Sequence, residues 1–293
     1  MIGPDAIPPR PPARDSGQDG GVAELRPRYE DVAQDGSIQP TALMHGIGHA
    51  VWRSLVMKNP AIEVFRAKGI LPILRRLVIV VDRRSVSVNV PIRYEGAYRF
   101  AREKGGDRLF VNMWVEASAP ISNTFLPTPR DAPFERLGRI FAEHVISRPF
   151  EPPDRRKVTR LEGGPGVPEI PEDEHVFEPA EALLRDRALD DLGAISFGMM
   201  HTDSNQHVNS LVYPRVFEEA LVQRLAETGR DYKALLANAV EIRWRKPFFS
   251  GERAQIRAAM LEAPAGSPWT VGAAGAFFGA GDKPNSTIQT WLA

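Results

Sequence analysis

The chain has 293 residues, which suits two domains of about 100 to 150 residues each. Lysine plus arginine and aspartate plus glutamate both number 37, so no net charge is present to attract nucleic acid or an anionic membrane. The absence of cysteine excludes thiolate catalysis, cysteine-ligated metals and disulfides, and fits a reducing compartment. We therefore expect no nucleic-acid partner, and chemistry based on oxygen or nitrogen groups.

The N-terminal segment does not resemble an export signal, because it is dense in proline and lacks a long apolar stretch. No run of about 18 apolar residues, the length of a membrane-spanning helix, occurs in the sequence. The sequence therefore predicts a cytoplasmic protein without a membrane span.

Two stretches rich in proline, glycine and charge divide the chain. Residues 1–26 bury too little apolar surface to fold and are predicted to be a flexible tail. Residues 149–179 are predicted to be a linker for the same reason. The remaining residues form two predicted units, 27–148 and 180–293.

Both units are predicted to begin with a helix and continue with strands. In the first unit, apolar residues recur at helical spacing after Pro40, and strand-like segments follow within 74–94, 107–119 and 138–148. In the second unit, a helix is predicted over 211–226 and ends at Gly229, with strands within 239–249, 251–263, 269–280 and 286–293. The repeated order predicts an α+β protein in which each unit wraps an antiparallel sheet around a long central helix.

The most distinctive motif lies just before the second helix. It reads Asp203-Ser204-Asn205-Gln206-His207-Val208-Asn209-Ser210, with Tyr213 shortly after. The segment resembles the Asp-x-Asn-x-His-Val-Asn-Asn motif of the acyl-carrier-protein thioesterases and the broader hot-dog thioesterase superfamily, from which only Ser210 departs. The resemblance implies a double hot-dog fold and hydrolysis of acyl-CoA or acyl-carrier-protein thioesters in lipid or polyketide metabolism, without a cofactor.

The first half resembles the same layout without the same chemistry. Tyr29-Glu30-Asp31 and Gly36 resemble the loop before the helix, but no asparagine or histidine follows Asp31 at the required spacing. We expect the first repeat to keep the fold with a degenerate site.

The motif contains the groups that thioester hydrolysis requires. Asp203 can attack the carbonyl or activate water, and Asn205 can hold the water or the carboxylate. His207 can orient the carbonyl or transfer a proton. Because alternate residues of an extended segment project to one side, these three side chains are predicted to act together.

The segment after His207 is predicted to bind substrate. Backbone N–H groups of Val208, Asn209 and Ser210 at the start of a helix would serve as oxyanion donors. Tyr213 is a candidate for substrate contact, with packing as the alternative. Asp203 and Asn209 could also be ordinary turn and helix-cap residues, for which these residue types are preferred.

A second acidic residue is harder to place. The resemblance implies an acid on a strand after the helix, but Pro247 stands near that position, with Glu241 and Glu252 on either side. Glu219, on the predicted helix, is the remaining catalytic candidate.

Histidine and arginine clusters have other interpretations. His201 and His207 lack a third ligand nearby, so no metal site is predicted. His45 and His49 are expected to line the core edge or a pocket. The arginines Arg75, Arg76, Arg83 and Arg84 could meet an acidic carrier protein or coenzyme A phosphates, or could simply solvate a strand edge.

Two alternative functions remain open. A hot-dog dehydratase or hydratase of 3-hydroxyacyl thioesters has a motif resembling Asp-x-Asn-Pro-x-His, whereas here Asp203 and His207 are one position closer and Gln206 replaces the proline. A non-catalytic acyl-thioester-binding protein would fit the missing second acid. The sequence leaves the acyl group, its carrier and self-association into a homo-oligomer open.

Overall fold

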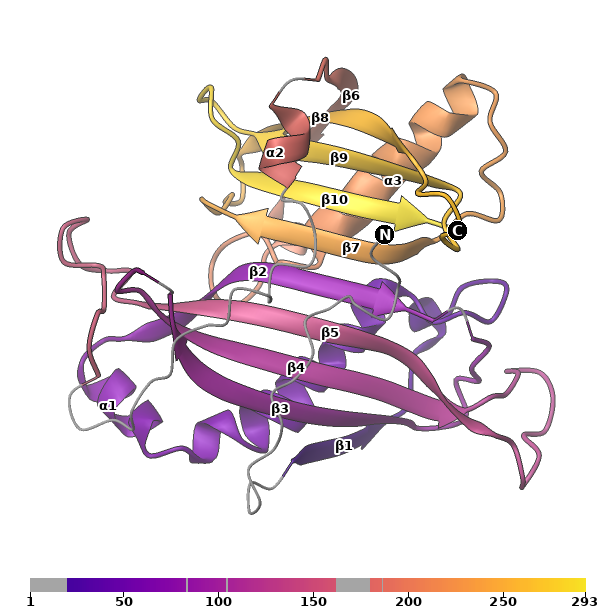
Figure 1. Cartoon of the computed structure of the whole chain (residues 1–293), viewed down its shortest axis with the longest axis horizontal. Coiled ribbons are helices and arrows are strands. Elements are labelled where there is room, and N and C mark those ends of the chain that lie inside the picture. The colour runs from indigo at the N-terminus through magenta and orange to yellow at the C-terminus, as the bar shows by residue number, and fades with distance from the viewer. Residues whose placement is uncertain (1–19, 83, 104, 162–179, 186) are drawn as a thin grey trace. The chain divides into compact units, whose positions relative to one another are not determined.

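The computed structural model describes residues 20–82, 84–103, 105–161, 180–185 and 187–293. These residues form two compact units, one before and one after residues 162–179 in the sequence (Figure 1). Each unit is an antiparallel sheet with helical segments, so the predicted α+β class is confirmed.

The first unit is an antiparallel sheet with the strand order β1-β3-β4-β5-β2. Its strands are β1 (Gly21–Leu25), β2 (Leu71–Val81), β3 (Ile92–Arg102), β4 (Leu109–Pro120) and β5 (Phe134–Ser147). Its helical segments are 3₁₀ turns at Tyr29–Asp31, Pro40–Met44 and Val56–Lys58, a π-helix at Ile47–Arg53, and α1 (Ala61–Ala67).

The long helix predicted in the first unit is wrong as a regular α-helix. Its apolar residues do face the core, since Leu43, Ile47 and Val51 are buried. However, residues 40–58 alternate between 3₁₀ and π turns. Gly46 and Gly48 lower the helix propensity of this stretch, so contacts with the sheet decide its local geometry.

The second unit has the strand order β6-β8-β9-β10-β7, which matches the first unit strand for strand. Its strands are β6 (Asp190–Ser196), β7 (Ala237–Trp244), β8 (Arg253–Glu262), β9 (Val271–Phe278) and β10 (Ser286–Leu292). Its helical segments are α2 (Ala180–Leu184), a 3₁₀ turn at Met199–His201 and α3 (Val212–Glu227).

The predicted second helix is confirmed as α3, including its end. Gly229 has a φ of 70°, and the N–H groups of Gly229 and Arg230 donate to the carbonyl oxygens of Ala226 and Leu225. These paired bonds are a Schellman motif, which requires a left-handed residue after the helix.

The core of the second unit lies between α3 and the sheet. Phe217 of α3 is fully buried and its ring centroid lies 6.2 Å from that of Phe277 on β9. A Cβ on Gly275 would lie 2.4 Å from a ring carbon of Phe217, so only glycine lets the helix approach this closely.

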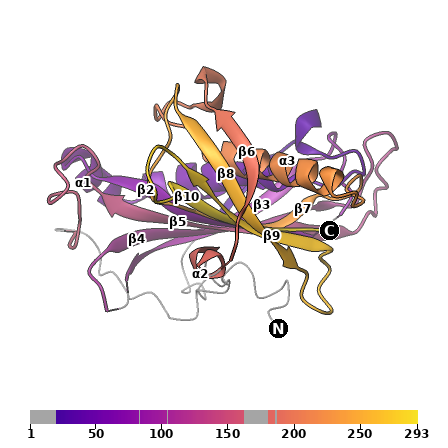
Figure 2. The ribbon, with the colours of Figure 1, turned by 90° about the horizontal axis from the view of Figure 1, so that it is seen from above.

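The opposite face of the second sheet is covered by α2. Thr287 on β10 donates a hydrogen bond to Glu181 of α2 at 2.8 Å. Figure 2 shows α2 and α3 on opposite sides of β9 and β10. Side chains of the second sheet therefore point either toward α3 or toward the opposite face.

The sequence did not indicate the two edge strands. Gly21–Leu25 form β1, which pairs with β3, so the predicted tail 1–26 is wrong over these residues; residues 1–19 lie outside the described part. Only backbone pairing with a distant strand distinguishes β1 from a tail, and β6 escaped prediction for the same reason.

The first residues of the predicted linker contact the first unit. Ser147 and Lys157 form an isolated β-bridge, and Val158 is buried. The N–H of Arg148 also donates to the carbonyl oxygen of Arg156 at 2.9 Å. Residues 162–179 of the predicted linker lie outside the described part.

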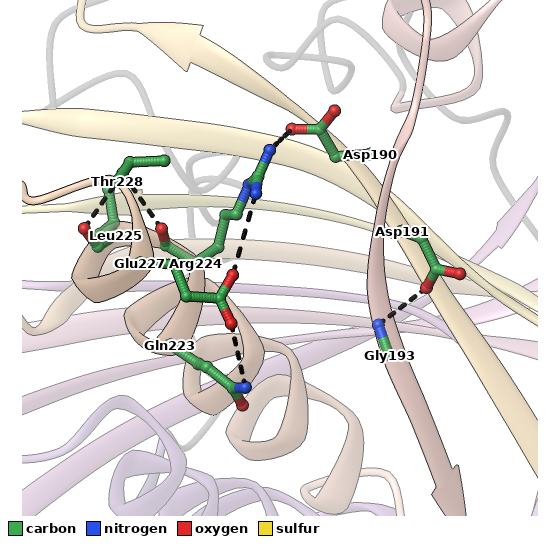
Figure 3. Close-up of polar contacts among 8 residues, drawn as sticks. All are labelled: Asp190, Asp191, Gly193, Gln223, Arg224, Leu225, Glu227 and Thr228. Carbon is green, nitrogen blue, oxygen red and sulfur yellow. Dashed lines mark hydrogen bonds and ion pairs between the residues drawn. The ribbon is translucent and has the colours of Figure 1, made fainter.

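The edge strand β6 is held to α3 by exposed polar contacts (Figure 3). Arg224 of α3 donates to Asp190 of β6 at 3.0 Å and lies 3.8 Å from Glu227. Within β6, the N–H of Gly193 donates to Asp191 at 2.8 Å. These contacts fix the strand from which the motif loop departs.

Among the helices of the described residues, none has the length and apolar character needed to cross a membrane.

Candidate active site

The candidate site is a hairpin loop between β6 and α3. Thr202 and Val208 form a β-bridge that closes the loop. At its tip the N–H of Gln206 donates to the carbonyl oxygen of Asp203 at 2.9 Å, and Gln206 has a φ of 67°. A left-handed third residue is the usual feature of a three-residue hairpin loop.

Two backbone hydrogen bonds flank the bridge. The N–H of Asp203 donates to the carbonyl oxygen of His207 at 3.2 Å, and that of Asn209 to the carbonyl oxygen of His201 at 2.8 Å. Cross-strand neighbours share a side and successive residues alternate. The side chains of Asp203, His207 and Asn209 therefore lie opposite those of Thr202 and Val208. His201 belongs to the 3₁₀ turn Met199–His201, to which strand alternation does not apply.

The Asp203 carboxylate has two fixed partners. One oxygen accepts the backbone N–H of Asn205 at 2.8 Å, and the other accepts the side-chain amide of Asn209 at 2.9 Å. The Asn209 carbonyl in turn accepts the N–H of Leu211 at 2.8 Å, just before α3. Asp203 is thus a turn residue whose carboxylate orientation is set by a second side chain.

His207 has a defined tautomer. Its Nδ1 lies 3.2 Å from the carbonyl oxygen of Val208, which can only accept, so Nδ1 must carry the proton of this hydrogen bond. In the neutral ring Nε2 is then an acceptor. His207 is half-buried and Asn205 is exposed, so both can meet solvent or substrate.

The loop is anchored to the turn after β7. The N–H of Val208 donates to the carbonyl oxygen of Phe248 at 2.8 Å. The N–H of Phe248 donates to the hydroxyl of Tyr213 at 3.3 Å. Tyr213 is buried, and burial raises its pKa to about 12, so its hydroxyl stays protonated. Its contact with substrate stays a prediction.

Two of the predicted oxyanion donors need correction. The N–H of Val208 donates to Phe248, and that of Asn209 donates to His201, so neither is free for substrate. The prediction failed because α3 begins only at Val212, so these two N–H groups precede the helix and bond to Phe248 and His201. Ser210 keeps its backbone N–H without an acceptor among the residues that the structure describes.

The carboxylates near the motif have different environments. Glu219 is exposed on α3. Its neighbour Glu218 accepts the N–H of Ala237 at 2.7 Å, and burial raises the pKa of Glu218. Nothing described places Glu219 beside Asp203, so its catalytic role stays a prediction.

The strand and turn acids flanking Pro247 are also occupied. Glu241 is buried and pairs with Arg243 at 2.8 Å. It alternates with Ile242, which lies on the α3 face of β7 with Trp244, so Glu241 faces away from α3. Glu252 accepts the N–H of Phe249 at 2.9 Å.

The first unit contains a loop with the same backbone pattern. The N–H of Asp31 donates to the carbonyl oxygen of Arg28, as the N–H of His201 does to that of Gly198. The N–H groups of Ala33 and Gly36 donate to Ser37 and Ala33, as those of Asp203 and Gln206 do to His207 and Asp203. The N–H of Gln39 donates to Asp31, as that of Asn209 does to His201. Asp31 therefore corresponds to His201, and Ala33 to Asp203.

The first loop lacks the motif side chains. Ala33 replaces Asp203, and Ser37 replaces His207. Asp35, at the position of Asn205, accepts both the N–H and the hydroxyl of Ser37, at 2.9 and 3.0 Å.

Asp31 has a separate environment in the first unit. It is buried and accepts hydrogen bonds from the backbone and guanidinium of Arg28, with His45 Nε2 3.8 Å away. Burial by itself would raise the pKa of Asp31, but the Arg28 bonds and the charges of Arg28 and His45 hold it below its usual value. This ion pair stabilises the first loop.

The predicted arginine cluster is divided among different partners. Arg76 is buried, and its guanidinium lies over the Phe141 ring. Arg75 lies over Phe110, and Arg84 pairs with Glu135 at 3.0 Å. Arg83 is outside the described part. In the described ranges no group of three or more potential metal ligands is found.

Gln206→Gly is expected to raise the free energy of unfolding by about 1 kcal/mol, because a side chain in the left-handed region is strained. Chemical denaturation of parent and variant measures this. Gly36, at the corresponding position of the first loop, has a φ of 86°. Gly36→Ala should therefore destabilise the protein, and equal stability of Gln206→Gly and parent would contradict the expectation.

Neither a protein-family profile nor a curated protein matches the sequence. Solved structures do match. An acyl-ACP thioesterase from Bacteroides thetaiotaomicron is 11% identical, with a TM-score of 0.61 over 94% of this chain and 98% of that one.

Two further structures match at similar levels. A protein named as an oleoyl thioesterase from Lactobacillus plantarum is 14% identical with a TM-score of 0.65, covering 94% of this chain and 97% of that one. The 12:0-ACP thioesterase from Umbellularia californica is 14% identical with a TM-score of 0.59 and the same coverages. The chain therefore has the fold of the acyl-ACP thioesterases over almost its whole length.

Proposed function

We propose that this protein hydrolyses acyl thioesters at the loop that carries Asp203, Asn205 and His207. The observation that carries the proposal is the second hydrogen bond on Asp203. A turn residue needs only the backbone bond from Asn205, whereas the Asn209 amide also fixes the other carboxylate oxygen at 2.9 Å. That orientation is useful for a carboxylate that must meet water or substrate.

The proposed reaction begins with attack by water. Asp203 takes a proton from the water, whose oxygen bonds to the carbonyl carbon while the carbonyl electron pair moves to oxygen. Asn205 holds the water with its amide. When the intermediate collapses, the C=O bond re-forms, the C–S bond breaks with its electrons on sulfur, and the proton passes through His207 Nε2 to the thiolate. The products are a carboxylic acid and a thiol.

We also propose that the two units are copies of one hot-dog unit. Their matching strand orders support this, as do the matching hydrogen bonds of their two loops. Because Ala33 and Ser37 replace the reactive residues, the first copy would hold a degenerate site.

The substrate is proposed to be an acyl-CoA or acyl-carrier-protein thioester. Two of the similar structures are named as acting on acyl carrier proteins, which supports the substrate class without fixing the acyl group.

One alternative function has a supporting observation. A non-catalytic acyl-thioester-binding protein would need no second acid, and here Glu219 is exposed while Glu241 is paired with Arg243. The dehydratase alternative has no such support, since Gln206 stands at the tip of the loop where that motif has proline.

The test is hydrolysis of acyl-CoA and acyl-pantetheine thioesters of short, long and aromatic chains, followed by release of free thiol. Hydration of 2-enoyl thioesters is followed in parallel by absorbance. We expect thiol release from at least one substrate and no hydration. Hydration without thiol release would instead establish a dehydratase, and binding without either reaction would establish an acyl-binding protein.

A further inference from the structure

His201 shares the loop with the proposed catalytic residues but has no part in the mechanism above. It pairs with Asn209 across the loop, and Asp203 pairs with His207. The Asn209 side-chain amide in turn donates to the Asp203 carboxylate at 2.9 Å. The backbone of His201 therefore holds the residue whose amide orients the Asp203 carboxylate.

The two histidines of the loop have opposite tautomers. The backbone N–H of Gly198 donates to His201 Nδ1 at 2.9 Å, so that nitrogen is unprotonated and the ring hydrogen lies on Nε2. His207 has the reverse arrangement, because its Nδ1 donates to a carbonyl oxygen. An edge contact with Phe197, at 5.8 Å between ring centroids, also holds the His201 ring. The loop thus presents one imidazole N–H donor and one imidazole acceptor.

The proposed reaction needs hydrogen-bond donors, and His201 can supply one. A developing oxyanion needs hydrogen-bond donors, yet the N–H groups of Val208 and Asn209 are already used within the protein. In the described part of the chain, no hydrogen bond of His201 Nε2 is found. Within the described part of the chain, the loop therefore offers two donors without an acceptor, the fixed Nε2–H of His201 and the backbone N–H of Ser210.

We propose that His201 is a further catalytic residue, whose Nε2–H donates a hydrogen bond to the thioester carbonyl oxygen as it becomes an oxyanion. This inference rests on the proposed function. The two histidines then have separate roles: His201 stabilises the oxyanion, and His207 moves the proton.

Two substitutions separate this role from a structural one. In His201→Asn the side-chain oxygen takes the place of Nδ1, which keeps the Gly198 bond but removes the Nε2 donor. In His201→Gln the amide N–H reaches the place of Nε2, which keeps a donor but gives up the Gly198 bond. A donor role predicts that Gln retains activity, whereas a capping role predicts that Asn does.

We expect His201→Asn to lower kcat by about a hundredfold to a thousandfold, as for loss of one oxyanion donor, with a smaller change in KM. His201→Gln should stay within about tenfold of the parent, since one hydrogen bond to the backbone is worth less than that. The loss should be equal for alkyl and aryl thioesters, because the oxyanion forms with either leaving group. Thr202→Val, on the opposite side of the bridge, is the matched control and should leave kcat unchanged.

A second measurement does not depend on activity. Long-range nitrogen–hydrogen NMR spectra of the ¹⁵N-labelled protein should show the ring proton of His201 on Nε2 and that of His207 on Nδ1. The reverse tautomer at His201 would overturn the inference, as would full activity in His201→Asn. If the parent hydrolyses no thioester, the proposed function fails, and the proposed role of His201 fails with it. If the parent is active and His201→Asn keeps full activity, only the proposed role of His201 fails.

Discussion

Asp203→Asn is expected to lower kcat for thioester hydrolysis by at least about a hundredfold, the low end for losing a general base. The substitution keeps the size of the side chain, and its remaining oxygen can still accept the N–H of Asn205, as Asp203 does at 2.8 Å. What disappears is the negative charge and the second acceptor for the Asn209 amide. The parent and the variant are compared by thiol release under saturating substrate, with circular dichroism to confirm folding.

The chain offers a matched control on β6. Asp191 accepts the N–H of Gly193 at 2.8 Å, the same local turn bond that Asp203 makes with Asn205 (Figure 3). Asp191→Asn should therefore disturb a turn equally while leaving kcat at the parental value. Equal activity of Asp203→Asn and Asp191→Asn would reduce Asp203 to a turn residue.

Phe217→Ala is expected to lower the free energy of unfolding by about 3 to 5 kcal/mol, because the cavity left by a buried ring is not refilled. Phe217 is fully buried between α3 and β9. Denaturant titration measures this loss, with the dependence of the free energy of unfolding on denaturant concentration expected to be the same in parent and variant. Glu219→Ala, exposed two residues further along α3, should change stability by less than about 0.5 kcal/mol.

A double-mutant cycle with Gly275 tests the contact itself. A Cβ on Gly275 would lie 2.4 Å from the Phe217 ring and 2.8 Å from the carbonyl oxygen of Arg257. Gly275→Ala should therefore destabilise the parent strongly and the Phe217→Ala background less, leaving a coupling energy of about 1 kcal/mol or more. Additive effects would show that the ring and the glycine do not restrict each other.

Local signals in the sequence determined α3 and its surroundings. The spacing of apolar residues predicted the helix over 211–226, of which Phe217, Leu221 and Leu225 are buried. Gly229 predicted the helix end, because the left-handed cap is a property of neighbouring residues. Runs of β-branched and aromatic residues likewise predicted β4, β5 and the strands β7 to β10. The predicted segment within 74–94 instead contains most of β2 and only the start of β3. The motif loop was also correctly placed before the helix.

Distant contacts decided the chemistry of the loop. The predicted oxyanion donor at Val208 failed because its N–H bonds to Phe248, 40 positions further along the chain, which no local pattern reveals. Periodicity could not show that Glu241 faces away from α3, since that depends on the pairing of β7 with β10. The separate tautomers of His201 and His207 likewise depend on which backbone group each ring meets in the folded loop. The sequence by itself determined α3, several strands and the motif. The tertiary structure decided the edge strands, the helical geometry of the first unit and which polar groups remain free, because hydrogen-bond partners are chosen only when the chain is packed.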